Sequence, residues 1–304
     1  MHYAAGMIVV VGSLNQDTVL RVPHLPHPGE TIAATGSQTV SGGKGANQAV
    51  GVAKLGGEVT LVGCVGDDEA GRFLRDEVTA AGVTDAVAAV EQPTGAAFIC
   101  VGDDGENQIV LRPGANAALT PDRLQPHAEL IRSADVLLLQ LEIPMETVEA
   151  AIAIARTTED GPVIVLDPAP AAALPDGLAA QVDILTPNQT EAAIALGSDD
   201  PAALQAVCDA SDCCVALTCG ADGVRFFRPG EPPLSGEAFP VEAIDTTAAG
   251  DAFAAGLAVA IADGLAIDEM LATALAAGSL ATTKLGAQPS LPTRAELETL
   301  FGSM

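Results

Sequence analysis

Positive charge and aromatic side chains are both scarce in this chain of 304 residues. Its only lysines are Lys44, Lys54 and Lys284, and its formal net charge is -27 at pH 7. A surface of that charge repels nucleic acid and anionic lipid, so we expect neither nucleic acid nor a membrane as a partner. Aromatic residues make up 3% of the chain, with no tryptophan and one tyrosine, so stacking on a nucleobase is hardly available.

The sequence also lacks the patterns that are typical of membrane proteins, secreted proteins and zinc-binding proteins. No apolar run approaches the roughly 18 residues of a membrane span, and the first residues carry no secretory signal pattern. The six cysteines form no C-x-x-C pair, and the four histidines are too few to complete a zinc site. We therefore expect a cytoplasmic protein with reduced thiols. Residues 1–6 are expected to be a short N-terminal extension before a first strand that begins at Met7.

Strong acidity has two common interpretations. Disorder is disfavoured because 49% of the residues are hydrophobic and the segments are strongly periodic. An acidic, lysine-poor chain that still folds suits a cytoplasm with molar salt, where screening weakens the self-repulsion of the surface. We therefore hypothesise a halophilic protein.

Apolar runs alternate with helical stretches along most of the chain. The runs lie at residues 8–11, 59–62, 97–101, 136–139, 163–166, 184–185, 215–217 and 224–227. Helical patterns lie at 46–55, 69–80, 145–156, 190–196, 202–209, from about 251 to 283, and near 293–300. Continuous apolar strands separated by helices predict a three-layer, doubly wound α/β fold, with a mostly parallel sheet covered on both faces.

Two regions break this alternation. Residues 19–40 and about 94–111 alternate like exposed antiparallel strands. We expect them to form a small β-sheet lid, at about 18–40 and 94–112, on a main domain that spans residues 7–304.

The segment at residues 245–253 (DTTAAGDAF) carries the strongest chemical signal. Small residues stand where a helix is expected to begin, and Asp251 lies just inside it. Small side chains let backbone N–H groups approach a ligand, and a helix N-terminus favours an anion. An anion cradle beside a general base is suited to phosphoryl transfer to a hydroxyl group. The alternative is that Asp245 merely caps an Ala-rich core helix.

A glycine-rich segment at residues 41–49 (SGGKGANQA) opens another helix. It is not a P-loop, because Gly45 follows Lys44 where Ser or Thr is required. It also fails the dinucleotide pattern, because Gln48 stands at the last glycine position. What remains is a backbone that a ligand can approach closely, with Lys44 and Asn47 as donors. A helix entry that needs flexible backbone angles is the alternative.

Polar residues follow several of the predicted strands, at the sheet edge where α/β proteins bind ligands. Asn15 and Asp17 follow the first strand, and Glu142 follows the strand at 136–139. An Asx turn and a solvated strand end are the respective alternatives.

Two later segments leave the same choice between a ligand site and ordinary local structure. Asn188 and Glu191 have the spacing of a plain capping arrangement. The turn at residues 218–223 could wrap phosphates, or it is simply a hairpin.

Taken in order, these segments resemble the ribokinase-like (PfkB) carbohydrate kinase family over nearly the whole chain. The resemblance is carried by residues 12–17, 41–48, 113–119, 140–142, 167–170, 186–191, 245–253 and 286–290. It implies ATP-dependent phosphorylation of a sugar, with Mg²⁺ and K⁺ as cofactors, and a lid that also pairs two subunits into a homodimer. The first expectation is conversion of D-ribose to ribose 5-phosphate. Another pentose, a nucleoside or ribose 1-phosphate remains an alternative substrate, and a catalytically silent sugar-binding relative is the rival class.

The resemblance also assigns residues. It implies that Asp251 is the general base, and that the anion hole is formed by the amides of Ala248, Ala249 and Gly250. The implied sugar ligands are Asn15, Asp17, Gly42, Gly43, Lys44, Asn47 and Glu142. The implied nucleotide side is Asn188, Thr218, Gly220, Gly223 and Leu275, with Glu191 holding Mg²⁺ through water. The implied K⁺ site is Asp245, Thr247, Ala281, Lys284, Gly286 and Ser290.

Some positions depart from the family pattern. Leu275 stands where His or Asn often lies beside adenine, which leaves the nucleotide base preference open. Arg112 stands near the lid where an apolar residue is expected. An inward Arg112 could bind a phosphate already on the sugar, whereas an outward one is an ordinary surface arginine. The intact Asp251 segment argues against a silent relative.

Overall fold

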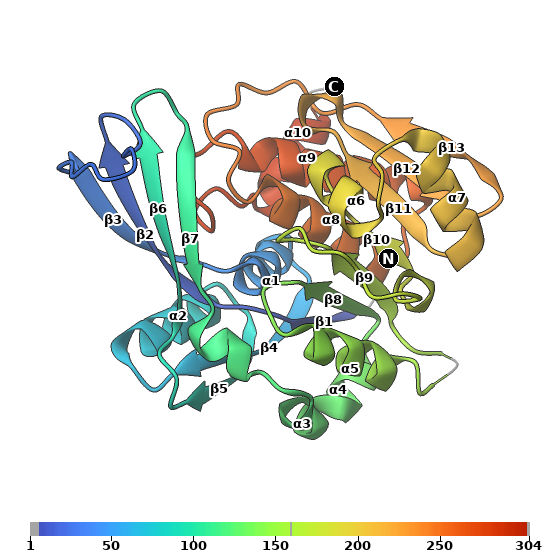
Figure 1. Ribbon diagram of the computed structural model, residues 1–304. Helices are drawn as coiled ribbons and strands as arrows, with labels where there is room; N and C mark the ends of the chain where they lie inside the picture. Colours follow the sequence, from blue (N-terminus) through green and yellow to red (C-terminus); the bar gives the residue numbers. More distant parts are fainter. Residues whose placement is uncertain (1–5, 159, 303–304) are drawn as a thin grey trace.

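The computed structural model describes residues 6–158 and 160–302. Apart from Gly6, the expected N-terminal extension lies outside these residues. A nine-stranded sheet forms the centre of the molecule (Figure 1). Its strands are, in order, β13 (Glu231–Gly236), β12 (Val224–Arg228), β11 (Cys214–Thr218), β10 (Ile184–Leu185), β9 (Val163–Asp167), β8 (Val136–Gln140), β1 (Met7–Val11), β4 (Glu58–Gly66) and β5 (Thr84–Val90). The seven strands from β11 to β5 are parallel, β12 pairs antiparallel with β11, and β13 pairs antiparallel with β12.

Helices cover both faces of this sheet, because the strands are apolar on both sides. In β1, Ile8 and Val10 join one buried cluster and Val9 and Val11 join the other. The first face is covered by α1 (Lys44–Lys54), α2 (Glu69–Ala80), α8 (Ala249–Ala262), α9 (Ile267–Ala281) and α10 (Arg294–Gly302). The second is covered by α3 (Pro121–Leu124), α4 (Ala128–Arg132), α5 (Met145–Ala155), α6 (Gln189–Ala195) and α7 (Pro201–Ser211). The predicted three-layer, doubly wound α/β fold is confirmed.

A second sheet of four strands stands beside the first (Figure 1). Its order is β3 (Gly36–Gly42), β2 (Asn15–Val22), β6 (Gly95–Gly102) and β7 (Asn107–Arg112). The expected antiparallel pairing joins β2 to β3 and β6 to β7, whereas the middle pair, β2 and β6, is parallel. Both of these strands follow parallel strands of the central sheet, β1 and β5, so they leave it in the same direction.

The order of the central strands locates the ligand edge. From β1 the chain builds β4 and β5 on one side, then returns to place β8 on the other. Such a reversal of strand order opens a crevice at the carboxyl ends of the strands. The second sheet begins at this edge, and α8 packs against β1, β8 and β9 beneath it.

The predicted helical stretch from 251 to 283 is two helices, α8 and α9. Gly264 lies between them with a φ of 67°, a left-handed conformation that ends a helix and suits glycine. None of the described helices is long and apolar enough to cross a membrane.

Candidate active site

Two glycines bring the N-terminus of α1 against the end of β1. Gly43 immediately precedes α1 with a φ of 90°, and a Cβ there would lie 2.7 Å from the backbone nitrogen of Asn15. A Cβ at Gly42 would overlap the carboxylate of Asp17. The close approach therefore requires glycine at both positions, and it places the expected sugar ligands Asn15 and Asp17 beside Lys44.

Glu142 organises the same region. Its Oε2 accepts hydrogen bonds from Ser13 Oγ (2.5 Å), Asn15 Nδ2 (3.2 Å) and the backbone nitrogen of Lys44 (3.0 Å). Asn116 Nδ2 in turn donates to Asn15 Oδ1 at 2.8 Å. Glu142 is thus tied to three neighbours from two other segments, unlike a simple solvated strand end. A cavity of about 280 Å³ opens beside it, lined in part by Asn15, Asn116 and Glu142.

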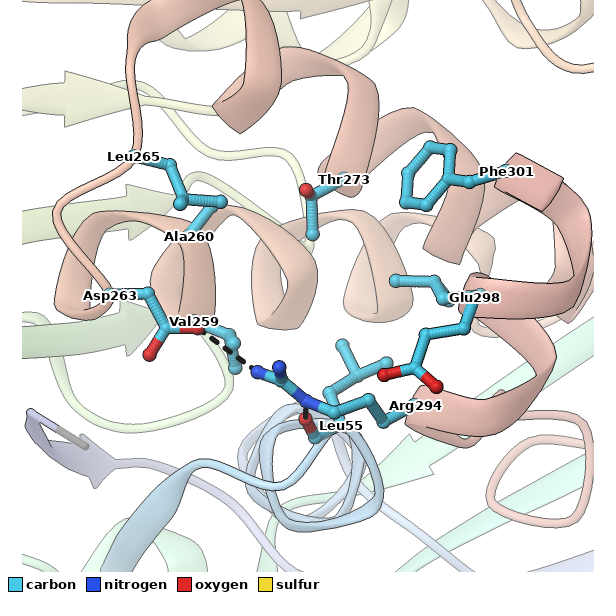
Figure 2. A pocket seen from close by; sticks show the side chains of 10 residues that line it. Leu55, Val259, Ala260, Asp263, Leu265, Thr273, Arg294, Glu298 and Phe301 are labelled. Atoms are coloured by element: carbon cyan, nitrogen blue, oxygen red, sulfur yellow. Dashed lines mark hydrogen bonds and ion pairs between the residues drawn. The ribbon is translucent and has the colours of Figure 1, made fainter. Parts of the chain in front are cut away.

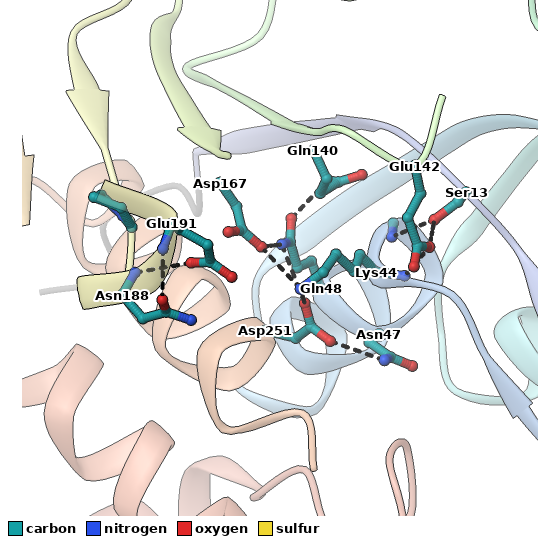
Figure 3. A network of polar contacts seen from close by, with 12 residues as sticks. Ser13, Lys44, Asn47, Gln48, Gln140, Glu142, Asp167, Asn188, Glu191 and Asp251 are labelled. Carbon is teal, nitrogen blue, oxygen red and sulfur yellow. Dashed lines mark hydrogen bonds and ion pairs between the residues drawn. The ribbon is translucent and has the colours of Figure 1, made fainter. Parts of the chain in front are cut away.

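Asp251 lies at the centre of the polar network in Figure 3, on the first turn of α8, and is 4% exposed. Asn47 Nδ2 donates to its Oδ2 at 2.9 Å, and Lys44 Nζ lies 3.8 Å from its Oδ1. Lys44 Nζ also lies 3.5 Å from Asp167 Oδ2. Burial alone would lower the pKa of Lys44, but Asp167, Asp251 and Glu142 together raise it. Lys44 therefore stays charged among these carboxylates.

Two of the carboxylates ionise with difficulty. Burial, and then repulsion by Glu142 and Asp251, raises the pKa of Asp17 to about 7. Burial also raises the pKa of Asp167 to about 7, although Lys44 opposes the shift. Asp17 Oδ1 is buried without a hydrogen-bond partner among the described residues. A buried oxygen of this kind suits a ligand that brings hydroxyl donors.

The start of α8 is strained. Ala248, which precedes the helix, has a φ of 60° and a ψ of 12°, a left-handed conformation that is unfavourable for alanine. Of the three amides expected to form the anion hole, that of Ala249 donates to the carbonyl oxygen of Thr246 at 3.2 Å. A Cβ at Gly250 would meet nothing within 4 Å. Space is therefore open beside the first turn of α8.

Asp245 does not cap α8, so the capping alternative is wrong. Its Oδ1 accepts from the backbone nitrogen (2.9 Å) and Oγ1 (2.6 Å) of Thr247, and its Oδ2 accepts from the backbone nitrogen of Gly286 (2.8 Å). Burial opposes ionisation, but these hydrogen bonds together lower the pKa of Asp245. An ionised Asp245 thus joins two of the loops expected to hold K⁺.

The remaining expected K⁺ ligands make other contacts. Lys284 Nζ pairs with Glu296 Oε1 at 2.5 Å, and Ser290 Oγ donates to the carbonyl oxygen of Ala287 at 2.7 Å. Ala281 is the last residue of α9. In the part of the chain that the structure describes, no cluster of His, Cys, Asp and Glu side chains could hold a metal ion.

The expected nucleotide side is adjacent to the carboxyl ends of β10 and β11. Asn188 and Glu191 form a capping box on α6, and the backbone nitrogen of Thr218 donates to Pro187 at 2.9 Å. Gly220 and Gly223 form the turn between β11 and β12, so the capping and hairpin alternatives both describe the local structure.

The turn packs against β13. A Cβ at Gly223 would overlap the carbonyl oxygen of Gly236, and a Cβ at Gly236 would lie 2.6 Å from Leu275 Cδ1. The residues expected on the nucleotide side therefore lie along one continuous path from α6 through β11 to α9.

A second cavity, of about 220 Å³, lies between α8, α9, α10 and the end of α1 (Figure 2). Arg294 in its wall donates to Leu55 O at 2.7 Å and to Asp263 Oδ2 at 3.0 Å. The guanidinium charge is thus paired within the wall, and none of the predicted site residues lines this cavity.

Comparison with known proteins places the chain in a family. The model of the pfkB family carbohydrate kinases matches residues 5–294. The chain belongs to the pfkB family. It is 41% identical to the ribokinase of Haemophilus influenzae over 297 residues, covering 95% of this chain and 96% of the relative. It is 40% identical to the ribokinase of Bacillus subtilis over 295 residues, covering 97% and 99%.

Solved structures of similar proteins agree with the pfkB fold. The ribokinase of Thermotoga maritima has a TM-score of 0.90 and 36% identity, covering 98% of this chain and 99% of its own. The Arabidopsis thaliana ribokinase complexed with ribose and ATP has a TM-score of 0.84 and 32% identity, covering 97% and 98%.

Arg112 occupies the rim of the larger cavity in this pfkB kinase. The arginine is exposed, and its Nη2 donates to the carbonyl oxygen of Thr94 at 3.0 Å. It also lines the same cavity as Asn15 and Glu142. Arg112 is therefore a surface residue with one side facing the candidate substrate cavity.

Sequence reasoning assigned no role to several residues of this network. Ser13 binds Glu142 and Asn116 binds Asn15. Gln48 donates to both Asp167 and Asp251, and Gln140 donates to Gln48. Gln48, Gln140 and Asp167 lie within segments that carried the family resemblance, and that was the available signal. Their contacts depend on how α1 packs against β8 and β9, which no local pattern specifies.

Proposed function

We propose that this pfkB kinase is an ATP-dependent ribokinase that converts D-ribose to ribose 5-phosphate. The central observation is the buried Asp251 at the N-terminus of α8, held by Asn47 and facing Lys44. The cavity lined by Asn15 and Glu142 lies on the same ligand edge. High identity over nearly full length to two ribokinases supports the choice of ribose.

In the proposed reaction, Asp251 removes the proton of the sugar 5-hydroxyl, which is a weak nucleophile until it loses that proton. The hydroxyl oxygen then bonds to the γ-phosphorus of ATP while the bond from that phosphorus to ADP breaks, and ADP leaves. Asn15, Asp17, Lys44, Asn47 and Glu142 hold the other hydroxyl groups, with glycine backbone at Gly42 and Gly43 alongside. The amides at the start of α8 stabilise the negative charge of the transferred phosphoryl group. The four-stranded sheet acts as a lid that excludes water and so limits hydrolysis of ATP.

The nucleotide is proposed to lie along Asn188, Thr218, Gly220, Gly223 and Leu275. Glu191, with its carboxylate beside the N-terminus of α6, would hold Mg²⁺ through water, and the ion would neutralise phosphate charge in a chain with few cations. The ionised Asp245 and the loops around Thr247, Ala281, Lys284, Gly286 and Ser290 would hold K⁺, with backbone carbonyl groups as the other ligands. Activity in KCl that exceeds activity in NaCl would support this K⁺ site.

The lid is also proposed to join two subunits. Phe98 and Val110, which are paired across β6 and β7, are 43% and 66% exposed on one face of the lid, an apolar surface that a second copy would cover. We further propose that the enzyme works in a salt-rich cytoplasm, where its charge is screened.

Ribose 1-phosphate is the second candidate substrate, because Arg112 lines the cavity that holds Asn15 and Glu142. The test is ATP-dependent phosphorylation in molar KCl with Mg²⁺, with ribose, 2-deoxyribose, fructose, adenosine and ribose 1-phosphate compared side by side. Preference for ribose in kcat/KM supports the proposal, and Arg112→Leu should then retain most activity. If the enzyme prefers ribose 1-phosphate and Arg112→Leu abolishes that preference, ribose 1-phosphate would become the proposed substrate in place of ribose. No turnover with any substrate would contradict the proposed activity.

A further inference from the structure

Two buried glutamine side chains form a chain of hydrogen bonds that ends at Asp251, from Gln140 to Gln48 and from Gln48 to Asp251. Gln48 of α1 is 0% exposed, and Gln140, the last residue of β8, is 1% exposed. A buried amide costs free energy unless its donors and acceptor are paired. The partners of these two amides therefore determine what the pair does.

Gln140 sets the direction of the Gln48 amide. Gln140 Nε2 donates to Gln48 Oε1 at 2.6 Å, which leaves Gln48 Nε2 to donate to Asp167 Oδ2 at 3.1 Å and Asp251 Oδ1 at 3.3 Å (Figure 3). With the Gln48 amide reversed, its oxygen would face two carboxylate oxygens and its NH₂ group would face that of Gln140. Both contacts would be repulsive, and the contact with the two carboxylates would stay repulsive even if the Gln140 amide reversed too, so the orientation shown is the favoured one.

The Gln48 amide supplies the second hydrogen bond to the Asp251 carboxylate. Asn47 binds Oδ2 and Gln48 binds Oδ1, so each oxygen of the carboxylate has its own directional donor. Lys44 Nζ, 3.8 Å from Oδ1, supplies charge but is too distant to set an angle. Gln48 also places its donor between Asp167 and Asp251, two carboxylates that repel each other.

Gln140 itself is held by this one bond. Its Oε1 is buried without a hydrogen-bond partner in the described part of the chain, and a Cβ at Gly12 would overlap that oxygen. The absence of a side chain at Gly12 therefore leaves room for the Gln140 amide, whose only hydrogen-bonded group among the described residues is the NH₂ that donates to Gln48. An unpaired buried oxygen at this position is a cost that a purely apolar side chain would avoid.

We propose that Gln140 and Gln48 are positioning residues for the reaction: Gln140 orients the Gln48 amide, and Gln48 fixes the plane of the Asp251 carboxylate. The inference rests on the proposed function, in which Asp251 accepts the proton of a sugar hydroxyl. A base must point a lone pair at that hydroxyl, and a displacement of about 1 Å can lower the rate on the order of 100-fold.

The test is a double-mutant cycle between Gln140→Met and Asp251→Asn. Methionine keeps the length of the side chain and removes both hydrogen-bonding groups. Gln140→Met is expected to lower kcat about 10- to 100-fold and to leave the KM for ribose and ATP within about threefold. In the Asp251→Asn background the same change should lower the residual rate less than about twofold, because the base is already gone.

Controls separate positioning from stability. Gln205→Met removes a glutamine of α7 that donates to Asp209 and to the carbonyl oxygen of Arg228, and it should leave kcat unchanged. If Gln140→Met does not fold, Gln48→Met takes its place in the cycle. A kcat within threefold of wild type for the folded variant, or an equal loss in both backgrounds, would overturn the inference.

The wild-type assay distinguishes this inference from the proposed function. If wild type does not phosphorylate ribose but accepts another sugar, ribose specificity fails and the cycle is measured with that sugar. If wild type turns over and the cycle is additive, the positioning role fails while the proposed function stands.

Discussion

At the residue scale, the fold shifts the pKa values of two carboxylates in opposite directions, Asp17 in the candidate site and Asp68 at the start of α2. Asp17 has its pKa raised to about 7 by burial and by repulsion from Glu142 and Asp251. Asp68, which caps α2, has its pKa lowered, because hydrogen bonds from Thr94 and Gly71 outweigh its burial. The two groups therefore contribute to stability with opposite dependence on pH.

Asp17→Asn is expected to stabilise the ligand-free protein. A carboxyl group whose folded pKa is raised favours folding below the unfolded pKa near 4, and that contribution is lost as pH rises through about 7. The gain from Asp17→Asn should therefore be larger at pH 8 than at pH 5, by about 2 kcal/mol, while ribose binding weakens. Denaturant unfolding in molar KCl measures the gain.

Asp68→Asn provides the control of opposite sign. Its wild-type carboxylate stabilises the fold above the unfolded pKa, so the substitution should destabilise the protein at pH 8. If Asp17→Asn raised the free energy of unfolding equally at pH 5 and pH 8, or lowered it, the fold would not be raising the pKa of Asp17.

The sequence could predict single residues only where a motif surrounds them. Asp251, Asn47 and Glu142 stand in segments with a chemical pattern, and the structure brings them to one edge of the sheet. Gln140 could not be assigned in this way, because its partner Gln48 lies 92 residues away and meets it only when α1 packs on β8. The strain at Ala248 was also beyond prediction, since alanine normally disfavours a positive φ.

At the element scale, the first turn of α8 carries the proposed anion hole. Gly250→Ala should stabilise the helix slightly, by roughly 0.5–1 kcal/mol, because glycine is a poor helix former and the added Cβ meets no atom within 4 Å. The same Cβ would enter the space proposed for the phosphoryl group, so kcat should fall by about tenfold or more. Thermal unfolding and steady-state kinetics give the two readouts.

Gly36→Ala on β3 is the matched control, since a Cβ there also meets nothing within 4 Å. It should leave kcat near that of wild type. Unchanged kcat in Gly250→Ala would place the transferred phosphoryl group elsewhere.

The lid strand β7 is the second element with a testable role. Val110→Asp places a charge on the exposed apolar surface of the lid, where Val110 is 66% exposed, and should dissociate the proposed dimer. Sedimentation velocity in molar KCl measures the mass. Ile194→Asp, at a 46% exposed position on α6, is the control that should leave the mass unchanged. A wild-type monomer, or a dimer that survives Val110→Asp, contradicts pairing through the lid.

Elements without a clear pattern were the ones that the sequence missed. β13 contains two prolines, which argue against a strand, yet it is an edge strand and an edge tolerates the missing N–H groups. β5 (TDAVAAV) is rich in alanine, which marks neither a strand nor a turn, and its partner β4 determines its conformation. The long central strands were predicted because burial on both faces makes them continuously apolar.

At the scale of the whole molecule, the large negative net charge makes the stability of the fold depend on salt. A net charge of -27 destabilises a compact chain through self-repulsion, and salt weakens that repulsion. The melting temperature should therefore rise by several degrees between 0.2 M and 2 M KCl, and NaCl should raise it similarly. A melting temperature that is independent of salt would contradict the halophile hypothesis.

The central claim is that Asp251 is the base of a ribose kinase. The most direct measurement compares wild type and Asp251→Asn for ATP-dependent ribose phosphorylation, together with ribose binding by calorimetry. The account predicts that kcat falls at least about 100-fold while the Kd for ribose changes by no more than a few-fold, because the amide keeps the shape of the site and loses the base. A near-normal rate in Asp251→Asn would contradict the account.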